Sequence, residues 1–152
     1  GLFLIRVGEG LRADAFRHPL TGQVARDGLC RQSTDYSCGA AASATLLHHL
    51  GVETTEDEMG RLCVTRRGLS GGTTEAGVLR GVRRKGLRVE VDRELRAPSM
   101  APIRLNALVA HWVVVTEATP SHVRIADPRG HWIGMSREIF NHMWLGSCVA
   151  VR

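Results

Sequence analysis

Residues 38–51 read CGAAASATLLHHLG, and the rest of the fold can be placed around this stretch. It is rich in helix formers and ends at Gly51, a residue type that is common just past the last turn of a helix. The small alanine side chains allow another element to approach closely, and the leucines supply anchors for a core. The stretch therefore predicts a buried helix that begins at Cys38.

Further helices are predicted at 55–63 and 73–86. The first opens on a Thr-x-x-Glu capping box, and the second is capped by Thr73 or Thr74 and ends at Gly86. A glycine-rich break at 68–72 separates them. It lacks the Lys and the preceding strand of a phosphate-binding P-loop, so we interpret it as a loop that could line a cleft.

After Gly86 the hydrophobic period changes from helical to alternating, which is typical of strands. Strands are predicted at 88–92, 102–106, 112–116, 122–126, 131–135 and 148–151, and a short helix at 136–144. Helices followed by an antiparallel sheet make an α+β fold without a βαβ repeat. We expect residues 1–30 to form a lead-in segment of loops and residues 31–152 to form one domain.

The composition excludes several classes of protein. A chain of 152 residues, 43% hydrophobic and 23% charged, fits one globular domain. Its net charge of +5 favours acidic partners, but the aromatic residues, 5% of the chain, are scattered, so nucleic acid is not expected as a partner. Without a Cys-x-x-Cys pair, and with dispersed histidines, neither a metal nor a cofactor is expected.

Cys38 is the first candidate for chemistry. A thiol at a helix N-terminus lies near unpaired backbone N–H groups and the positive end of the helix dipole, which favours the thiolate. The alternative is a buried, inert cysteine, a common fate of a free thiol. The chain has three other cysteines that could be of this kind or form a disulfide, Cys30, Cys63 and Cys148.

His111 and Asp127 are candidates for activating such a thiol. A nucleophilic cysteine needs a histidine to take its proton and a third group to fix the imidazole. We expect the strands on either side of a turn at 118–121 to pair as an antiparallel hairpin. The numbers of two residues that face each other then sum to about 239, so His111 lies opposite Asp127 or Pro128. Both side chains then lie at one end of an apolar core face. Such a pair is either structural or catalytic, and the residues alone leave both open.

Gln32 precedes Cys38 by six residues, across a predicted turn. Its side-chain amide could fold back beside the thiol and donate to a developing oxyanion, together with the backbone N–H of Cys38. The alternative is a surface glutamine.

Several segments resemble, in the same order, one family of proteins. Arg31–Ala42 and the Ala44–Leu47 run resemble the active-site helix of the papain-like cysteine peptidases that remove double-glycine leader peptides from bacteriocins. Pro102–Val115 resembles the histidine strand of that family, and Ala126–Gly130 its Asp-Pro turn. The remaining matching segments are Gly71–Gly86 and Phe140–Gly146. The resemblance covers some four fifths of the chain, from about Arg31 to the end.

By motif position the resemblance implies a papain-like fold with Cys38 as nucleophile, His111 as general base, Asp127 as orienting carboxylate and Gln32 as oxyanion donor. The implied activity is that of a cysteine endopeptidase. It would cleave a leader or precursor peptide after a Gly-Gly type motif, through a thioester and without a cofactor. The expected partner is such a peptide, and association with a membrane or an exporter is compatible with it.

Two departures from the family pattern concern the type of member. Ser37 stands where transporter-fused members usually have Asp, and 31 residues precede Gln32. Both features look more like the stand-alone bacterial members, some of which carry an export signal. Because the chain begins at Gly1 rather than Met, we expect a trimmed N-terminus. The expected location stays open between exported or periplasmic, membrane-associated and cytoplasmic.

Other functions remain open at this point. A transglutaminase-like amide exchange would use the same three groups on a Gln or Lys side chain, and fold alone does not exclude it. A peptide-binding domain with a dormant site would keep the fold without the reaction, although the presence of all four catalytic-type residues argues against dormancy. A basic nucleic-acid-binding domain would bind DNA in a salt-sensitive way without any need for the thiol.

Overall fold

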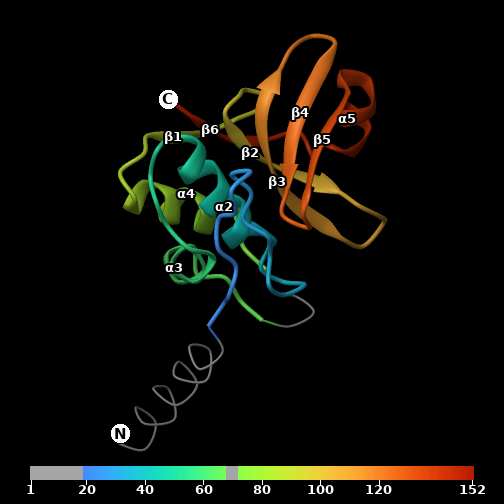
Figure 1. Ribbon diagram of the computed structural model, residues 1–152. Coiled ribbons are helices and arrows are strands. Elements are labelled where there is room, and N and C mark those ends of the chain that lie inside the picture. The colour runs from blue at the N-terminus through green and yellow to red at the C-terminus, as the bar shows by residue number, and fades with distance from the viewer. Residues whose placement is uncertain (1–18, 68–71) are drawn as a thin grey trace, which may run out of the picture.

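The computed structural model describes residues 19–67 and 72–152 (Figure 1). Its helices are α2 (Cys38–His49), α3 (Glu56–Leu62), α4 (Glu75–Arg84) and α5 (Arg137–Met143). Its strands are β1 (Val89–Asp92), β2 (Ser99–Arg104), β3 (Ala110–Ala118), β4 (His122–Asp127), β5 (His131–Ser136) and β6 (Cys148–Val151). In the described part of the chain three helices therefore precede the sheet, and the predicted α+β order is confirmed.

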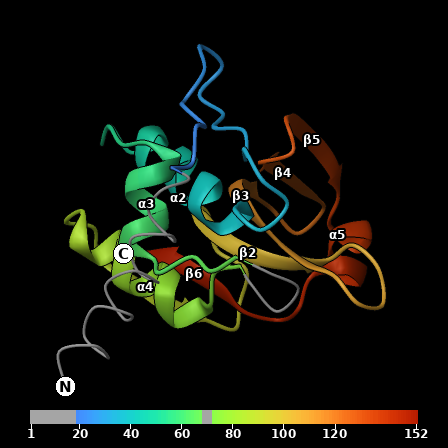
Figure 2. The same ribbon diagram turned by 90° about the horizontal axis from the view of Figure 1, so that it is seen from below.

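The six strands form one antiparallel sheet in the order β1-β6-β2-β3-β4-β5. Figure 2 shows α2, α3 and α4 gathered on one side of this curved sheet and α5 on the other. Each face has its own apolar core: Trp112 and Val114 of β3 pack with α2, whereas Val113 and Val115 pack with Phe140 of α5. Strands with two covered faces carry apolar residues on both, which is why β3 is buried from His111 to Val115.

Helix α2 lies at the centre of the larger core. Ten of its twelve residues are buried, and no polar face is left for solvent along most of its length. Leu46 and Leu47 are fully buried, and truncating either to Ala should cost about 2–5 kcal/mol. The helix that was predicted as the buried element is thus the one around which the others pack.

Two predictions about the sheet are wrong in detail. β2 begins at Ser99 rather than at Pro102, because the buried Ser-Met-Ala run does not alternate. The β3–β4 register runs through Val115↔Ile125 and then Glu117↔Arg124, so opposed numbers sum to 240 and 241 rather than about 239. A β-bulge between these two pairs adds one residue to β3, and the strand pattern carries no sign of it.

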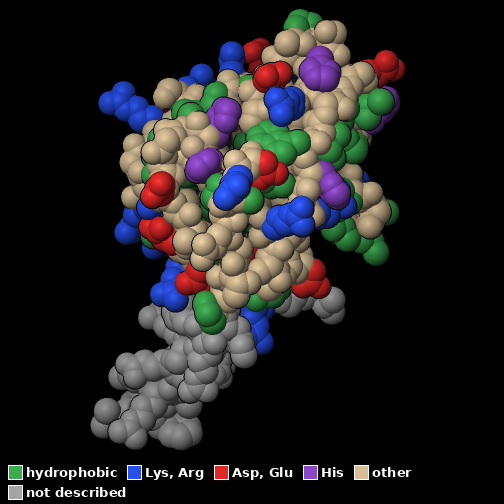
Figure 3. Space-filling model, viewed as in Figure 1, with side chains coloured by type: hydrophobic (Ala, Val, Ile, Leu, Met, Phe, Trp, Pro, Cys, Tyr) green, Lys and Arg blue, Asp and Glu red, His purple; other side chains and the backbone are tan. Residues whose placement is uncertain are grey.

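Charged side chains of both signs lie on the face of the molecule that Figure 3 shows. On the face in view in Figure 3, Lys and Arg side chains are dispersed among acidic and histidine side chains rather than gathered into one patch. Within the described residues no helix is both long and apolar enough to span a membrane. The same part of the chain contains no group of three or more His, Cys, Asp or Glu side chains placed to hold a metal ion.

Candidate active site

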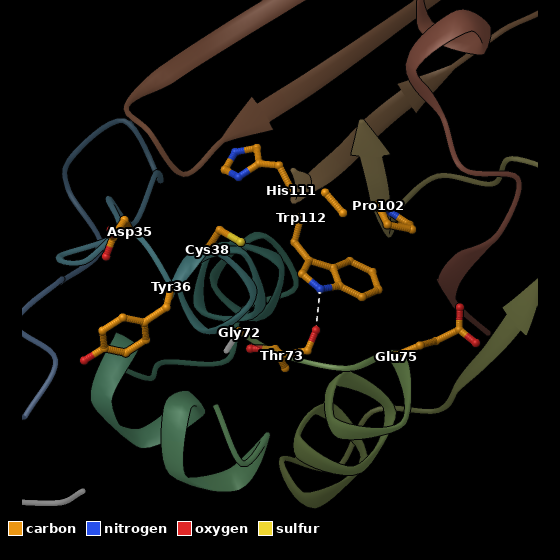
Figure 4. Close-up of a pocket in the computed structure, with 10 residues that line it drawn as sticks. Asp35, Tyr36, Cys38, Gly72, Thr73, Glu75, Pro102, His111 and Trp112 are labelled. Carbon is orange, nitrogen blue, oxygen red and sulfur yellow. Dashed lines mark hydrogen bonds between the residues drawn. The ribbon is translucent and has the colours of Figure 1, made fainter. Parts of the chain in front are cut away.

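Cys38 is the first residue of α2 and lies in the wall of a pocket of about 330 Å³ (Figure 4). Four parts of the chain form the pocket: the turn before α2, the segment before α4, the end of β2 and the start of β3. The segment before α4 includes Gly72 and Thr73, as the prediction of a cleft-lining loop required. Residues 68–71 of that loop lie outside the described residues. Cys38 is 8% exposed, so it is a mostly buried residue that still reaches the pocket wall.

His111, the second residue of β3, lines the same pocket and is buried. Its Nε2 lies 2.8 Å from Oδ1 of Asp127. A carboxylate only accepts, so Nε2 carries the proton and Nδ1 is left for the Cys38 thiol. Burial lowers the pKa of His111, but hydrogen bonds to Asp127 and Cys38 outweigh it and raise the pKa to about 9. The imidazole thus links the thiol to the carboxylate and readily takes a proton.

Asp127, at the end of β4, is also buried. Arg129 holds it from the other side, with Nη2 2.7 Å and Nε 3.0 Å from Oδ2, and the backbone N–H of Arg129 donates to Oδ1. Burial raises the pKa of Asp127, but the hydrogen bonds from His111 and Arg129 lower it well below its usual range. The group therefore stays a carboxylate at any pH at which the protein would work.

The pair His111–Asp127 forms although the predicted register was wrong. The β3–β4 pairs run as far as Val114↔Ala126. If the register is extended by one residue, Asp127 lies opposite Val113. His111 is then a diagonal neighbour of Asp127, a distance that an aromatic side chain can span. The observed sum of 240 pairs odd-numbered residues of β3 with odd-numbered residues of β4, so these residues share one face of the sheet. That face packs against α5 rather than α2, so the predicted core face is the smaller of the two.

Gln32 is placed near these groups, but its amide points elsewhere. Its backbone N–H donates to the carbonyl of Pro128 over 2.8 Å, which ties this loop to the residue after Asp127. The side-chain Nε2 donates to the Thr34 carbonyl over 2.9 Å, and Oε1 is buried without a hydrogen-bond partner among the described residues. The structure thus brings Cys38, His111 and Asp127 together. The Gln32 backbone lies next to Asp127, and only one of the two protons on its side-chain Nε2 is donated to Thr34.

The other three cysteines have different surroundings. Cys30, Cys63 and Cys148 are fully buried, and none of them lines the pocket. Burial is the main cause that raises the pKa of Cys30 to about 12 and that of Cys63 to about 11, and it raises the pKa of Cys148 as well. They remain neutral thiols, and all four cysteines are free rather than paired in disulfides.

Two residues at the site were not found from the sequence. Trp112 donates from Nε1 to the carbonyl of Thr73 over 2.8 Å and so joins β3 to the segment before α4 in the pocket wall. Arg129 is the second. An arginine two residues after the candidate carboxylate was a usable signal, since the turn brings the two together, whereas the contact of Trp112 with Thr73 spans 39 residues.

Comparison with known proteins identifies the family. Residues 27–152 match the Peptidase C39 family. The chain belongs to this family. It is 35% identical over 128 residues to an uncharacterized protein of Methanothermobacter marburgensis, a match that spans 81% of the chain and 87% of that protein. An uncharacterized protein of Methanothermobacter thermautotrophicus is 34% identical over 125 residues, with 79% and 84% covered.

Solved structures of peptidase domains have the same fold. The peptidase domain of Streptococcus ComA, described as a bi-functional ABC transporter involved in quorum sensing, superimposes with a TM-score of 0.72 at 22% identity, covering 81% of this chain and 96% of that domain. A double glycine motif protease from an AMS/PCAT transporter, solved in complex with the leader peptide, gives 0.68 at 21% identity, covering 89% and 94%. The resemblance stated from the sequence is confirmed, and this C39 domain has the papain-like fold.

Proposed function

We propose that this C39 domain is a cysteine peptidase that cleaves a leader or precursor peptide after a Gly-Gly type motif. The observation that carries the proposal is that the His111 imidazole, bonded through Nε2 to the buried Asp127 carboxylate, lines the same pocket as Cys38. Nucleophile, base and orienting group are the three parts that thiol acyl transfer needs.

The acylation step follows from this geometry. The Cys38 proton moves to Nδ1 of His111, and the thiolate attacks the carbonyl carbon of the scissile peptide bond. The C–S bond forms while the carbonyl π electrons move onto oxygen. The backbone N–H of Cys38 is the first donor for that oxyanion, and the Gln32 amide, which donates to Thr34 in this structure, turns toward the oxyanion to become the second. His111 then gives its proton to the leaving amine, the C–N bond breaks, and a thioester remains on Cys38.

Water completes the cycle. His111 takes a proton from a water molecule, whose oxygen attacks the thioester carbonyl, and the C–S bond breaks to release the carboxylic acid and the thiolate. Throughout both steps Asp127 keeps Nε2 protonated and stabilises the imidazolium, and Arg129 keeps Asp127 ionised. No further group is required for the proton balance.

The first turn of α2, next to Cys38, is closely packed. A Cβ added at Gly39, in the first turn of α2, would lie 2.5 Å from the Thr73 side chain and 3.1 Å from Cδ1 of Trp112. The first turn of α2 is therefore packed directly against the opposite wall. The Gly-Gly preference itself is taken from the solved relative that is named as a double glycine motif protease.

The solved relatives support the substrate class and a partner. One of them is named as a double glycine motif protease and was solved with a leader peptide, and another is the peptidase domain of an ABC transporter. We therefore extend the proposal to a Gly-Gly leader as substrate and to an exporter as a partner for this chain.

A matched set of peptides tests the specificity. Three peptides that differ only at the two positions before one peptide bond, as Gly-Gly, Ala-Ala and Leu-Leu, are incubated with the protein and analysed by mass spectrometry. We expect a cut after the second residue of the Gly-Gly peptide, at least about tenfold slower cleavage of Ala-Ala, and none of Leu-Leu. Equal cleavage of all three would overturn the Gly-Gly preference. Incorporation of an added amine into a glutamine side chain, with no cut, would favour the transglutaminase-like reaction.

A further inference from the structure

The N-terminus of α2 differs from those of the other described helices. At α3, α4 and α5 the hydroxyl of the N-cap residue accepts a hydrogen bond from a backbone N–H in the first turn. These bonds run from Glu58 N–H to Thr55, from Gly77 N–H to Thr74 and from Ile139 N–H to Ser136. Helix α2 also has a hydroxyl residue at this position, Ser37, but its side chain makes no capping bond.

The donor and both acceptor positions of the Ser37 hydroxyl are occupied by other partners. Its one proton goes to Oε2 of Glu56, at 3.0 Å, with the Thr34 carbonyl oxygen farther off at 3.3 Å. Its two lone pairs accept from the backbone N–H of Thr34 at 3.2 Å and from the Thr34 hydroxyl at 2.8 Å. A hydroxyl has one proton and two lone pairs, so nothing remains to cap α2. The first N–H groups of α2, that of Cys38 among them, are left for another acceptor.

Glu56, the first residue of α3, is fully buried and binds the chain that leads to Cys38. Oε1 accepts from the backbone N–H of Gly22 at 2.9 Å and from the Ser33 hydroxyl. Oε2 accepts from the backbone N–H of Ser33 at 2.7 Å and from the Ser37 hydroxyl. Four donors therefore occupy its two oxygens. None of the ion pairs found in the described part of the chain includes Glu56.

The residues that Glu56 holds flank both donors assigned to the oxyanion. Ser33 follows Gln32 directly, and Ser37 precedes Cys38 directly. Bonds to both fix the two ends of the turn that joins the Gln32 amide to the first turn of α2. The carboxylate also keeps the Ser37 hydroxyl away from the N–H groups that an oxyanion would use.

We propose that Glu56 is a positioning residue for acylation: it holds Ser33 and Ser37 so that the N-terminus of α2 stays uncapped and directed at the oxyanion. This inference rests on the proposed thiol acyl transfer. It concerns the transition state rather than the thiolate, because Glu56 contacts neither Cys38 nor His111 through a hydrogen bond. Loss of one oxyanion donor typically lowers kcat about 10²–10³-fold, so a misplaced donor should cost at least about tenfold.

Two reagents separate the transition state from the thiolate. With 4-nitrophenyl acetate, the Cys38 thiolate attacks the ester carbonyl, the C–S bond forms, the C–O bond breaks, and 4-nitrophenolate leaves, so an oxyanion forms on the way. With iodoacetamide, the thiolate displaces iodide at a saturated carbon, and no oxyanion forms. Both rates are measured on the whole chain, with intact mass and peptide mapping to locate each adduct on Cys38.

Glu56→Gln is the main variant, because it keeps the size of the side chain and replaces one accepting oxygen by a donor. We expect its acylation rate to fall at least about tenfold while its alkylation rate stays within about twofold of wild type. Glu58→Gln is the matched control, since Glu58 lies on the same helix but bonds Lys85 and Thr54. Both of its rates should equal those of wild type.

Ser37→Ala provides the second variant if Glu56→Gln does not fold. It removes one of the four donors and should lower acylation several-fold, again without a change in alkylation. Unchanged acylation in the folded variants overturns the inference, and so does a parallel fall of acylation and alkylation. If wild type accepts the ester at Cys38 but cuts no Gly-Gly peptide, the proposed specificity fails and the role of Glu56 stands. If wild type forms no ester adduct at Cys38, both fail.

Discussion

The starts of α2 and α4 show two uses of one local motif. Each helix follows a hydroxyl residue, and at α4 the hydroxyl of Thr74 accepts from the backbone N–H of Gly77 at 3.0 Å, which closes the helix end. At α2 the Ser37 hydroxyl is bound by Glu56 and Thr34, and the helix end stays open beside Cys38 and the pocket. A cap typically stabilises by about 0.5–2 kcal/mol. The open end gives up that stability where the proposed reaction needs free donors.

The largest effect on peptide cleavage is expected when Cys38, the nucleophile at the uncapped N-terminus of α2, is replaced. Cys38→Ala should abolish cleavage of the Gly-Gly peptide, because no other described cysteine lines the pocket. Cys63→Ala is the control, since Cys63 is a buried neutral thiol packed near Ser43, and it should leave cleavage by the folded protein nearly unchanged. Initial rates by chromatography decide the matter, and equal rates for the two variants would refute the assignment of Cys38.

A smaller but still large effect is expected from the carboxylate that orients His111. Asp127→Asn should lower kcat about 10²–10⁴-fold, because the amide supports the wrong imidazole tautomer. The pH profile should change as well. His111 must be protonated to serve the leaving amine, and its pKa of about 9 means that wild-type activity falls as the pH rises through about 9. Without Asp127 the pKa of His111 drops, so the alkaline limb moves to lower pH. An unmoved limb would contradict the pairing.

The smallest effect is expected on stability, when the cap at the N-terminus of α4 is removed. Thr74→Ala removes a working cap and should lower the free energy of unfolding by about 1 kcal/mol, as measured by urea denaturation. Ser37→Ala removes no cap, so its main effect should be on acylation. If Thr74→Ala left the free energy of unfolding unchanged, the contrast between the two helix ends would lose its energetic basis.

Hydrophobic period and local signals predicted most of the fold and the three groups at its centre. The helix at Cys38 and the hairpin strands follow from patterns within a few residues of one another. His111 meets Asp127 although the predicted register was wrong, because the observed register puts odd-numbered residues of both strands on one face. The exporter-fused or stand-alone character of the protein and the division of the chain at residue 30 stay predictions.

The missed features are contacts between distant parts of the chain. Glu56 meets Ser33 and Ser37 across 23 and 19 residues, and no local pattern of the sequence marks it as buried. The direction of the Gln32 amide depends in the same way on how its loop packs against the Asp-Pro turn, through the bond to Pro128. Tertiary packing, rather than propensity, places these groups.

Detection of an acyl-enzyme on Cys38 is the decisive measurement for the proposed thiol mechanism. Wild-type protein mixed with the Gly-Gly peptide is quenched in acid within its first turnovers, digested at low pH and mapped by mass spectrometry. We expect the N-terminal part of the peptide as a thioester on the fragment that contains Cys38. Two results would contradict the thiol mechanism. In the first, the peptide is cut but the acyl group is found on a residue other than Cys38. In the second, the peptide is cut and no covalent adduct is found at any quench time, even with the slower Asp127→Asn variant.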